Sequence, residues 1–350
     1  MITIPGLIDI HVHLRTPGQT HKEDFQTGSM AAIAGGFTTV IDMPNNKVPI
    51  TTLPLLNEKM KIASTETLTD IGFYFGSLGD NLSEFDEVKD KVFGIKLYLN
   101  ETTGNFLITE DTLSKIYDAW NGGPILVHAE DDAVKAVINN TRRTRKATHF
   151  CHISLRSDLE QIVKAKDEGL PITCGITPHH LFLTQKDADT IGSYGKMKPY
   201  LKSEEDVNHL WKHLDQIDVI ESDHAPHTRE EKEGENPPFG VPGLETTLPL
   251  LLTAVHEGKL SIDDIIRLCH DNPMRILKIP PQDATVEIDP EEEYILQNEN
   301  LFTKCGWSPF TGRVMHGRVK RVTLRGNVVF ENEKITAQPG YGRVLTPDVL

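Results

Sequence analysis

Two histidines near the start of the chain, His11 and His13, follow the apolar run Ile8-Asp9-Ile10. Side chains of a β-strand alternate between its two faces, so residues two positions apart project to the same face. Two imidazoles side by side offer the nitrogen ligands that suit zinc and other transition metals better than magnesium. The alternative is a strand that carries two hydrogen-bonded histidines, and the pair alone favours neither interpretation.

Four more polar residues lie within or near the C-terminal ends of predicted strands: Lys96, His128, His152 and Asp223. The strand ends of a parallel barrel converge on one face, where barrel active sites are built. The set could therefore complete a site for two metals, with Asp223 as a ligand that also accepts a proton from a metal-held water. Taken singly, the histidines are more typical of hydrogen-bonded rim residues, and Asp223 of a turn or helix cap.

Lys96 lies inside the apolar segment Gly94–Leu99. A lysine in such a strand is costly unless it is paired, modified or deprotonated. Its head could reach water at the barrel rim, or it could carry a carbamate, an anionic bidentate group able to bridge two metals. Two metals that share a hydroxide generate a nucleophile at neutral pH and polarise a carbonyl, which favours hydrolysis of an amide-like bond or its reversal.

Three residues just beyond predicted strand ends could bind a substrate: Arg15, Asn45 and His227. A guanidinium group can hold a carboxylate through two parallel hydrogen bonds, so Arg15 is a candidate for an anionic substrate. Asn45 could add a donor. On physical grounds alone, a surface-loop position is an equally good interpretation of Arg15 and Asn45.

Short apolar runs alternate with amphipathic stretches over the first 280 residues. The predicted strands are Gly6–His11, Thr38–Met43, Ile71–Phe75, Val92–Leu99, Ile125–His128, Thr148–His152, Pro171–Ile176 and Val219–Asp223. Helical patterns between them include Asp24–Ala34, Thr109–Trp120, Ala133–Thr141, Ser157–Glu168 and Ser203–Leu214. Strand–helix alternation of this kind favours an α/β fold and a closed (β/α)₈ barrel. An open doubly wound sheet is the alternative, but no Gly-x-Gly-x-x-Gly follows the first strand.

The pattern changes in the last part of the chain. Short β-like runs lie at Ala284–Ile288, Arg318–Arg325 and Asn327–Phe330. We therefore expect a metal-dependent barrel over residues 1–280 and a small β-rich tail over residues 281–350 that packs on the barrel. The segment Lys232–Gly243, rich in proline and glycine, is expected to form a mobile loop.

Composition narrows the class of protein. The chain of 350 residues has a formal net charge of −15, which argues against nucleic acid or an anionic membrane as a partner. Its 4 cysteines lack the spacing of a disulfide framework, which is typical of a reducing cytosol. No signal-peptide pattern and no apolar run of about 18 residues is present. We therefore expect a soluble cytoplasmic protein.

Together these residues resemble dihydroorotases of the amidohydrolase superfamily, and among them the dihydroorotase domain of the animal multifunctional pyrimidine-synthesis protein. The resemblance extends over nearly the whole chain. The motifs that carry it are His11-Val-His13-Leu-Arg15, Met43-Pro44-Asn45, Lys96-Leu-Tyr-Leu-Asn100-Glu-Thr102, His128-Ala-Glu, Cys151-His152, Pro178-His179-His180-Leu-Phe-Leu, Ser222-Asp223-His-Ala-Pro-His227, Pro242-Gly-Leu-Glu245, Pro309–Gly317 and Pro339-Gly-Tyr-Gly342.

The resemblance implies a distorted TIM barrel with two zinc ions bridged by N6-carboxylated Lys96 and a hydroxide. The implied ligands are His11, His13, Lys96 and Asp223 for one zinc, and Lys96, His128 and His152 for the other. Asp223 is the implied catalytic acid/base. The residues implied to hold the substrate carboxylate are Arg15, Asn45 and His227. The flexible loop implied to close over the substrate begins at Asn100, Glu101 and Thr102.

The implied activity is the reversible cyclisation of N-carbamoyl-L-aspartate to L-dihydroorotate in de novo pyrimidine (UMP) biosynthesis. The resemblance also implies a homodimer, with aspartate transcarbamoylase as a candidate partner. Two alternatives stay open. A related cyclic amidase, such as an allantoinase or hydantoinase, shares the metal site without the same clamp for a ring carboxylate. A non-catalytic relative could be a scaffold for aspartate transcarbamoylase, although such relatives usually lose the metal ligands that this chain retains.

Three positions depart from the animal-type domain. Gly175 replaces a glutamate that helps to hold a third zinc with the cysteine matching Cys151, so we expect no tightly bound third zinc. Lys198 replaces an arginine, which keeps the charge but loses the bidentate geometry. Thr103 replaces an aromatic residue in the flexible loop, so loop closure is expected to be weaker or differently timed.

Overall fold

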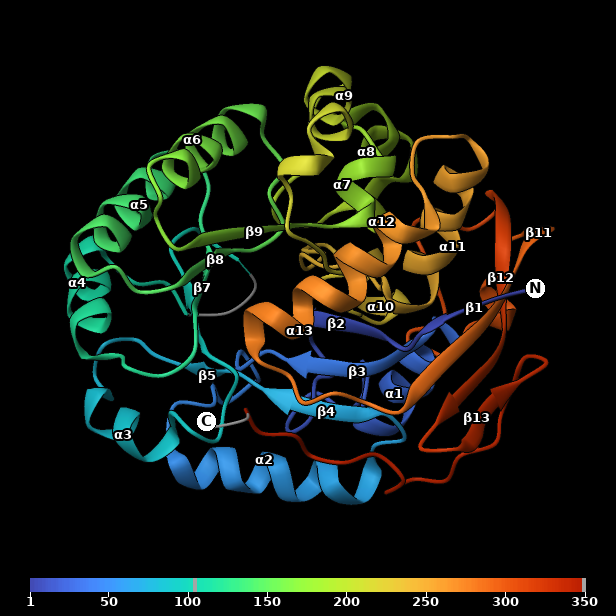
Figure 1. Ribbon diagram of the computed structural model, residues 1–350, viewed down its shortest axis with the longest axis horizontal. Coiled ribbons are helices and arrows are strands. Elements are labelled where there is room, and N and C mark those ends of the chain that lie inside the picture. Colours follow the sequence, from blue (N-terminus) through green and yellow to red (C-terminus); the bar gives the residue numbers. More distant parts are fainter. Residues whose placement is uncertain (103–105, 348–350) are drawn as a thin grey trace.

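Parallel strands at the centre of the molecule form a barrel (Figure 1). The computed structural model describes residues 1–102 and 106–347. One part of the barrel sheet contains β2 (Leu7–Val12), β3 (Phe37–Asp42) and β4 (Asp70–Phe73). The other part contains β5 (Phe75–Gly76), β6 (Ile95–Tyr98), β7 (Ile125–His128), β8 (Thr148–Phe150), β9 (Ile172–Ile176) and β10 (Val219–Ile220).

The two parts of the sheet join at both ends. Tyr74 alone separates β4 from β5. At the other join, Val12 forms a parallel bridge with His224, and the His13 N–H donates to the His224 carbonyl at 2.8 Å. Every residue of β2 and β3 is buried, as expected for strands covered on both faces. The predicted (β/α)₈ barrel is therefore confirmed. It is distorted because its sheet is divided into a three-stranded and a six-stranded part instead of being hydrogen-bonded continuously.

Helices surround the barrel, and α4, α5 and α6 form a row on one side of it (Figure 1). Their bounds are α1 (Phe25–Ala34), α2 (Leu53–Glu66), α3 (Phe85–Val88), α4 (Glu110–Ala119), α5 (Asp132–Thr144), α6 (Arg156–Asp167), α7 (Pro178–Phe182), α8 (Gln185–Ile191), α9 (Glu204–Lys212), α10 (Arg229–Glu233), α11 (Leu244–His256), α12 (Ile262–Ile266) and α13 (Asn272–Leu277). Within the described ranges, none of the helices has the length and apolar character needed to cross a bilayer.

Helix starts follow from capping residues that are visible in the sequence. Thr109 accepts the Thr112 N–H at 3.3 Å and begins α4, and Ser203 accepts the Asp206 N–H at 3.2 Å and begins α9. Such caps satisfy backbone donors that have no partner within the first helical turn. The predicted helices agree with the observed ones because their caps and their apolar periodicity are both local properties.

The tail forms a five-stranded antiparallel sheet beside the barrel (Figure 1). Its strands, in spatial order, are β1 (Ile2–Pro5), β11 (Ala284–Ile295), β12 (Val314–Leu324), β13 (Asn327–Glu331) and β14 (Lys334–Ile335). α11 packs closely on β12: a Cβ at Gly317, whose φ is 88°, would lie 2.6 Å from the Leu252 Cβ. The edge strand β1 comes from residues that the predicted division assigns to the barrel, and that division stays a prediction.

The segment 232–243, expected to be a mobile loop, is attached to its surroundings through the Lys232 side chain. The Lys232 side chain is fully buried. Its Nζ donates to three carbonyl groups at 2.9 to 3.1 Å, those of Lys196, Pro238 and Gly240. The Lys232 ammonium group thus binds all three carbonyls. The amino-acid composition of the segment does not indicate these hydrogen bonds.

A buried ion pair orders the segment after β3. Lys59, on α2, is fully buried, and its Nζ lies 2.7 Å from the Asp42 carboxylate. The same Nζ donates to the Met43 carbonyl at 2.8 Å and to Asn46 Oδ1 at 2.9 Å. Asp42 also accepts the Leu14 N–H at 2.7 Å. The pair therefore fixes the end of β3 relative to the end of β2.

Replacing Lys59 with methionine is expected to lower the free energy of unfolding by about 3–5 kcal/mol. Methionine keeps most of the side-chain volume but leaves the Asp42 carboxylate buried without its cation. Urea denaturation measures the loss. The double variant Asp42→Asn/Lys59→Met should recover part of it, because no uncompensated charge remains. A loss below about 1 kcal/mol in the single variant, the size typical of a surface pair, would contradict the prediction.

Candidate metal centre

The barrel gathers the six predicted metal ligands at one end of its strands. Five of the side chains come from the last residues of a strand or from the residues just after it, Lys96 lies in the first half of β6, and all six are buried. The set consists of His11 and His13 at the end of β2, Lys96 on β6, His128 at the end of β7, His152 after β8 and Asp223 after β10.

His152 and Asp223 lie outside regular strands, which corrects two predicted boundaries. β8 ends at Phe150 and β10 at Ile220, although the sequence pattern continues both strands to the ligand. His152 and Asp223 have positive φ angles of 37° and 45°, which residues with a Cβ rarely adopt. Such conformations persist only where the surroundings hold them, and they are concentrated at functional sites.

One group of the predicted ligands surrounds Asp223. Its Oδ1 lies 3.3 Å from His11 Nε2 and 3.1 Å from His13 Nε2. The three side chains offer ligand atoms within 4.8 Å of one another, close enough to share a metal ion. On the opposite side of the His13 ring, Nδ1 lies 2.8 Å from Asn45 Oδ1. A partner of this kind fixes the tautomer and orientation of a metal-binding histidine.

A second group of the predicted ligands packs against the first. His128 Nδ1 lies 3.1 Å from His152 Nε2, and the two ring centroids are 4.6 Å apart. The His152 ring is also 5.0 Å from the His11 ring. The structure therefore brings together imidazoles from three different strand ends.

Lys96 is a fully buried lysine close to these imidazoles. Its Nζ lies 3.0 Å from Cys151 Sγ and 5.0 Å from the centre of the Tyr98 ring. An ammonium group here would repel a metal ion, whereas a carbamate on the same nitrogen would attract one. Carboxylation of Lys96 stays a prediction.

Burial keeps the imidazoles neutral. It lowers the pKa of His11 to about 4 and holds the pKa values of His13 and His152 well below the usual value of 6.5. A neutral imidazole keeps a lone pair for a metal ion. Within the described ranges, His11 Nδ1 and His152 Nδ1 make no hydrogen bond. Neutral nitrogen donors beside a carboxylate therefore fit a zinc-type metal.

Arg15 and Asn45 both line the cleft, and His227 contacts Arg15. Arg15 Nη2 lies 3.2 Å from His227 Nε2, and Arg15 Nε donates to the Pro226 carbonyl at 3.2 Å. Burial, reinforced by the Arg15 charge, lowers the pKa of His227 to about 3, so this imidazole is neutral as well. Asn45 Oδ1 contacts His13, and Asn45 lines the same cleft as Arg15. The joint role of the three residues in substrate binding stays a prediction.

The predicted flexible loop begins at the edge of the same cleft. Thr102 lines the cleft, and Asn100 Oδ1 accepts the Glu130 N–H at 2.8 Å. Glu101 is exposed. Thr103 lies outside the described residues.

The cleft at the ligands is narrow, with a volume of about 40 Å³. Its other walls include Tyr98, Phe239 and Lys198, and the Lys198 Nζ lies 4.1 Å from the centre of the Tyr200 ring. Lys198 therefore adds a positive charge to the cleft that Arg15 also lines.

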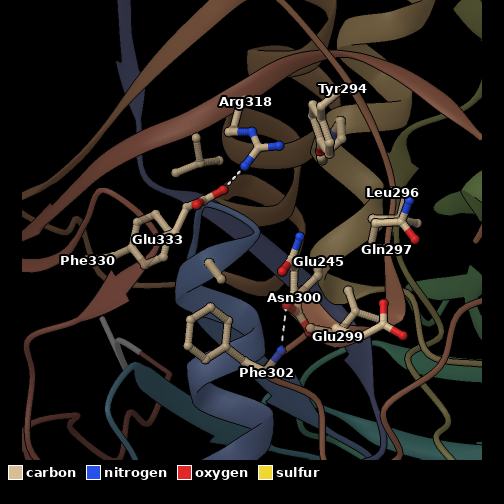
Figure 2. A pocket seen from close by; sticks show the side chains of 14 residues that line it. Glu245, Tyr294, Leu296, Gln297, Glu299, Asn300, Phe302, Arg318, Phe330 and Glu333 are labelled. Carbon is tan, nitrogen blue, oxygen red and sulfur yellow. Dashed lines mark hydrogen bonds and ion pairs between the residues drawn. The ribbon is translucent and has the colours of Figure 1, made fainter.

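A larger cavity, of about 330 Å³, lies between α11 and the tail sheet (Figure 2). Three of the charged side chains drawn there, Glu245, Arg318 and Glu333, already have partners. Glu245 accepts the Phe302 N–H at 2.8 Å, and Arg318 forms an ion pair with Glu333 while its guanidinium lies 3.8 Å from the centre of the Tyr294 ring. The smaller cleft instead brings four buried histidines together with Asp223, and it is therefore the candidate site for the chemistry.

Two buried carboxylates contact the predicted ligands without having been predicted as site residues. Glu130 Oε1 lies 3.3 Å from His128 Nε2, and Glu221 Oε2 lies 3.5 Å from His11 Nδ1. Glu130 follows His128 by two residues, so its spacing could have revealed it. Glu221 reaches a histidine more than two hundred positions away in the chain, and no local signal points to that contact.

The sequence matches the Amidohydrolase family over residues 2–287. The chain belongs to this family. This amidohydrolase is 42% identical over 347 residues to the Multifunctional protein CAD of Squalus acanthias, a match that covers 98% of the chain and 16% of that protein. It is 36% identical over 370 residues to the dihydroorotase of Pyrococcus abyssi, covering 98% of the chain and 87% of that protein.

Among solved structures, the amidohydrolase resembles the L-hydantoinase (dihydropyrimidinase) from Arthrobacter aurescens. The TM-score is 0.95 at 26% sequence identity, and the match covers 99% of this chain and 89% of that chain. These similarities confirm the barrel class and imply a metal centre. The chain spans only a sixth of the multifunctional relative's length, so that protein's other activities do not transfer to it.

Proposed function

We propose that this amidohydrolase is a dihydroorotase, which reversibly cyclises N-carbamoyl-L-aspartate to L-dihydroorotate in de novo pyrimidine biosynthesis. The observation that carries the proposal is the convergence of His11, His13 and Asp223 in a buried cleft that Arg15 also lines. A metal centre beside a cationic side chain suits a cyclic amide that carries a carboxylate. The name of the Pyrococcus abyssi relative supports the same activity.

The donor set supports two zinc ions. One ion would be held by His11, His13 and Asp223, and the other by His128 and His152, with carboxylated Lys96 shared between them. When bound, the ions would supply activated water and polarise the carbonyl that is attacked. The neutral, buried imidazoles support this assignment.

Asp223 holds and moves the proton in this proposal. Its carboxylate is buried in the cleft within 3.3 Å of His11 and His13, so it lies beside the place where an activated water would be held and can accept a proton there. During hydrolysis the carboxylate accepts a proton from the attacking water and passes it to the ring nitrogen that leaves. During cyclisation the two transfers run in reverse.

Arg15 binds the carboxylate that substrate and product share. Its side chain is buried at the cleft, where a charged hydrogen bond is stronger than in water. His227, neutral and in contact with Arg15, can add a further hydrogen bond. Asn45 can contribute through its amide nitrogen while its oxygen holds His13.

Replacing Arg15 with alanine is expected to raise KM for both substrates about 10- to 100-fold, because one charged hydrogen-bonding group is lost. kcat should change less, since the interaction is made in the ground state and the transition state alike. Steady-state kinetics by ultraviolet absorbance measure both constants. Arg156→Ala, which removes a surface arginine paired with Glu160, is the control. An unchanged KM in Arg15→Ala would contradict the binding role.

A hydantoinase-like cyclic amidase is the second candidate, because the chain shares its barrel with the hydantoinase. Zinc analysis combined with a panel of dihydroorotate, hydantoin and allantoin separates the candidates. About two zinc ions per chain with preferred turnover of dihydroorotate is the expected result. Hydantoin or allantoin turned over equally well or better would contradict a dihydroorotase. If the chain holds no metal and turns over no substrate, even after zinc and bicarbonate are added, the result would favour a non-catalytic scaffold for aspartate transcarbamoylase.

We further propose that the enzyme is a cytoplasmic homodimer with aspartate transcarbamoylase as a candidate partner. All four cysteines are free and buried, which supports a reducing compartment. The homodimer and the partner rest on the family resemblance.

A further inference from the structure

Glu221 is a buried carboxylate that the proposed mechanism does not use. It follows β10 directly and is fully buried. On the neighbouring strand β9, Gly175 makes room for it: a Cβ at position 175 would lie 2.6 Å from Glu221 Oε1. The carboxylate therefore occupies the space that a side chain at position 175 would fill.

One oxygen of Glu221 faces a ring nitrogen of a predicted metal ligand. Oε2 lies 3.5 Å from His11 Nδ1, and the other nitrogen of that ring, Nε2, faces Asp223 at 3.3 Å. A carboxylate that contacts one nitrogen of a histidine fixes the tautomer in which the other nitrogen keeps its lone pair. The His11 ring therefore has its free nitrogen on the Asp223 side.

The same oxygen lies among polar atoms that need a partner. Oε2 is also 3.6 Å from His149 Nε2. In the part of the chain that the structure describes, His11 Nδ1, His149 Nε2 and Glu221 Oε2 make no shorter hydrogen bond. Buried polar atoms without partners are costly, and one carboxylate oxygen can accept from two N–H groups. Glu221 is the acceptor that both rings share.

The other oxygen of Glu221 holds the backbone of a second ligand. Oε1 accepts the His152 N–H at 2.6 Å. His152 has a φ of 37°, a conformation that must be held by its surroundings. A short hydrogen bond to a carboxylate is a strong restraint of that kind.

We propose that Glu221 is a positioning residue of the metal centre, which fixes the His11 ring and the His152 backbone from the space left by Gly175. The proposal rests on the metal centre of the proposed function and not on its substrate. Direct ligation of a further metal is the competing role, because His11, Cys151 and Glu221 offer ligand atoms within 4.8 Å. Positioning is favoured because Lys96 Nζ already contacts Cys151 Sγ at 3.0 Å.

Zinc affinity, measured by competition with a chelator, and zinc content at saturation test the proposal. Glu221→Ala should weaken zinc binding about 10- to 100-fold, the usual loss for a residue that orients a ligand, with the number of zinc ions at saturation unchanged. Glu221→Gln should also weaken binding, because its single amide oxygen can accept from either the His11 ring or the His152 N–H but not from both, and the amide NH2 group must face the other donor. Asp70→Asn, a buried carboxylate at the start of β4, is the control and should bind zinc like the parent chain.

Gly175→Ala tests the same contact without changing Glu221. The new Cβ should displace the carboxylate and weaken zinc binding. The double variant Gly175→Ala/Glu221→Ala should bind zinc no worse than Glu221→Ala, because the clash is then gone. Urea denaturation of each variant checks that the fold is retained.

Three results would overturn the proposal. Glu221→Gln with parent-like zinc affinity would show that the side chain only fills space. Additive losses in the double variant would show that Gly175 and Glu221 act separately. A third zinc in the parent chain that Glu221→Ala loses would make Glu221 a ligand. The titration contains no substrate, so the expected zinc pattern without dihydroorotate turnover would contradict the proposed function while supporting this proposal.

Discussion

Replacing Asp223 with asparagine is expected to lower kcat for dihydroorotate hydrolysis at least about 1000-fold. Asparagine keeps the shape of the side chain but cannot accept the proton of the attacking water. It also removes the negative charge that lies 3.1 to 3.3 Å from His13 and His11 and would hold a metal ion there. Steady-state kinetics in both directions, at saturating zinc, measure the loss.

Asp218→Asn is the matched control for Asp223→Asn. Asp218 directly precedes β10, at the opposite end of the strand, and its carboxylate lies 2.5 Å from Lys166. This control should retain kcat, although its stability is expected to fall. A near-normal kcat in Asp223→Asn with zinc content unchanged would show that another group moves the proton.

Replacing Lys96 with methionine is expected to remove both tightly bound zinc ions and to abolish turnover. Methionine fits the buried space but cannot form a carbamate, so the anionic bridge between the two ligand groups is lost. Metal analysis after dialysis and the hydrolysis assay give the two readouts. For the parent chain stripped of metal, zinc alone in CO₂-free buffer should restore little activity, and zinc with bicarbonate should restore most of it.

Lys59→Met is the control for Lys96→Met. Lys59 is also a fully buried lysine, but its Nζ binds Asp42 and backbone and side-chain oxygens rather than lying among the imidazoles. Lys59→Met should lose stability and keep its zinc. Retention of two zinc ions and normal turnover in Lys96→Met would rule out the carbamate. If the metal-stripped parent chain recovers equal activity from zinc with and without bicarbonate, that result would also rule out the carbamate.

Predictions that depend on neighbouring residues in the chain agreed with the structure. Period-2 and helical patterns located the barrel strands and several helices, because apolar periodicity and capping act over a few residues. The same patterns placed His11, Lys96 and His128 near strand ends. Barrel geometry then required these ends to converge, so the approximate position of the candidate site followed from the pattern as well.

Predictions that depended on the exact path of the backbone were less accurate. The strands expected to reach His152 and Asp223 end two and three residues earlier, because both ligands adopt positive φ. In the segment 232–243, Lys232 binds three carbonyls that its composition does not indicate. Neither feature is visible in local propensity, because contacts with distant residues stabilise these conformations.

The sequence by itself determined the barrel, the family resemblance and the residue types of the metal centre, since each is recorded in local periodicity or in short motifs. Only the tertiary structure decided which atoms meet. In the folded chain Asn45 contacts His13, Glu221 contacts His11, and β1 pairs with β11 of the tail sheet. These pairings link residues far apart in the chain, and the closure of the barrel and the packing of its strands determine which distant side chains come into contact.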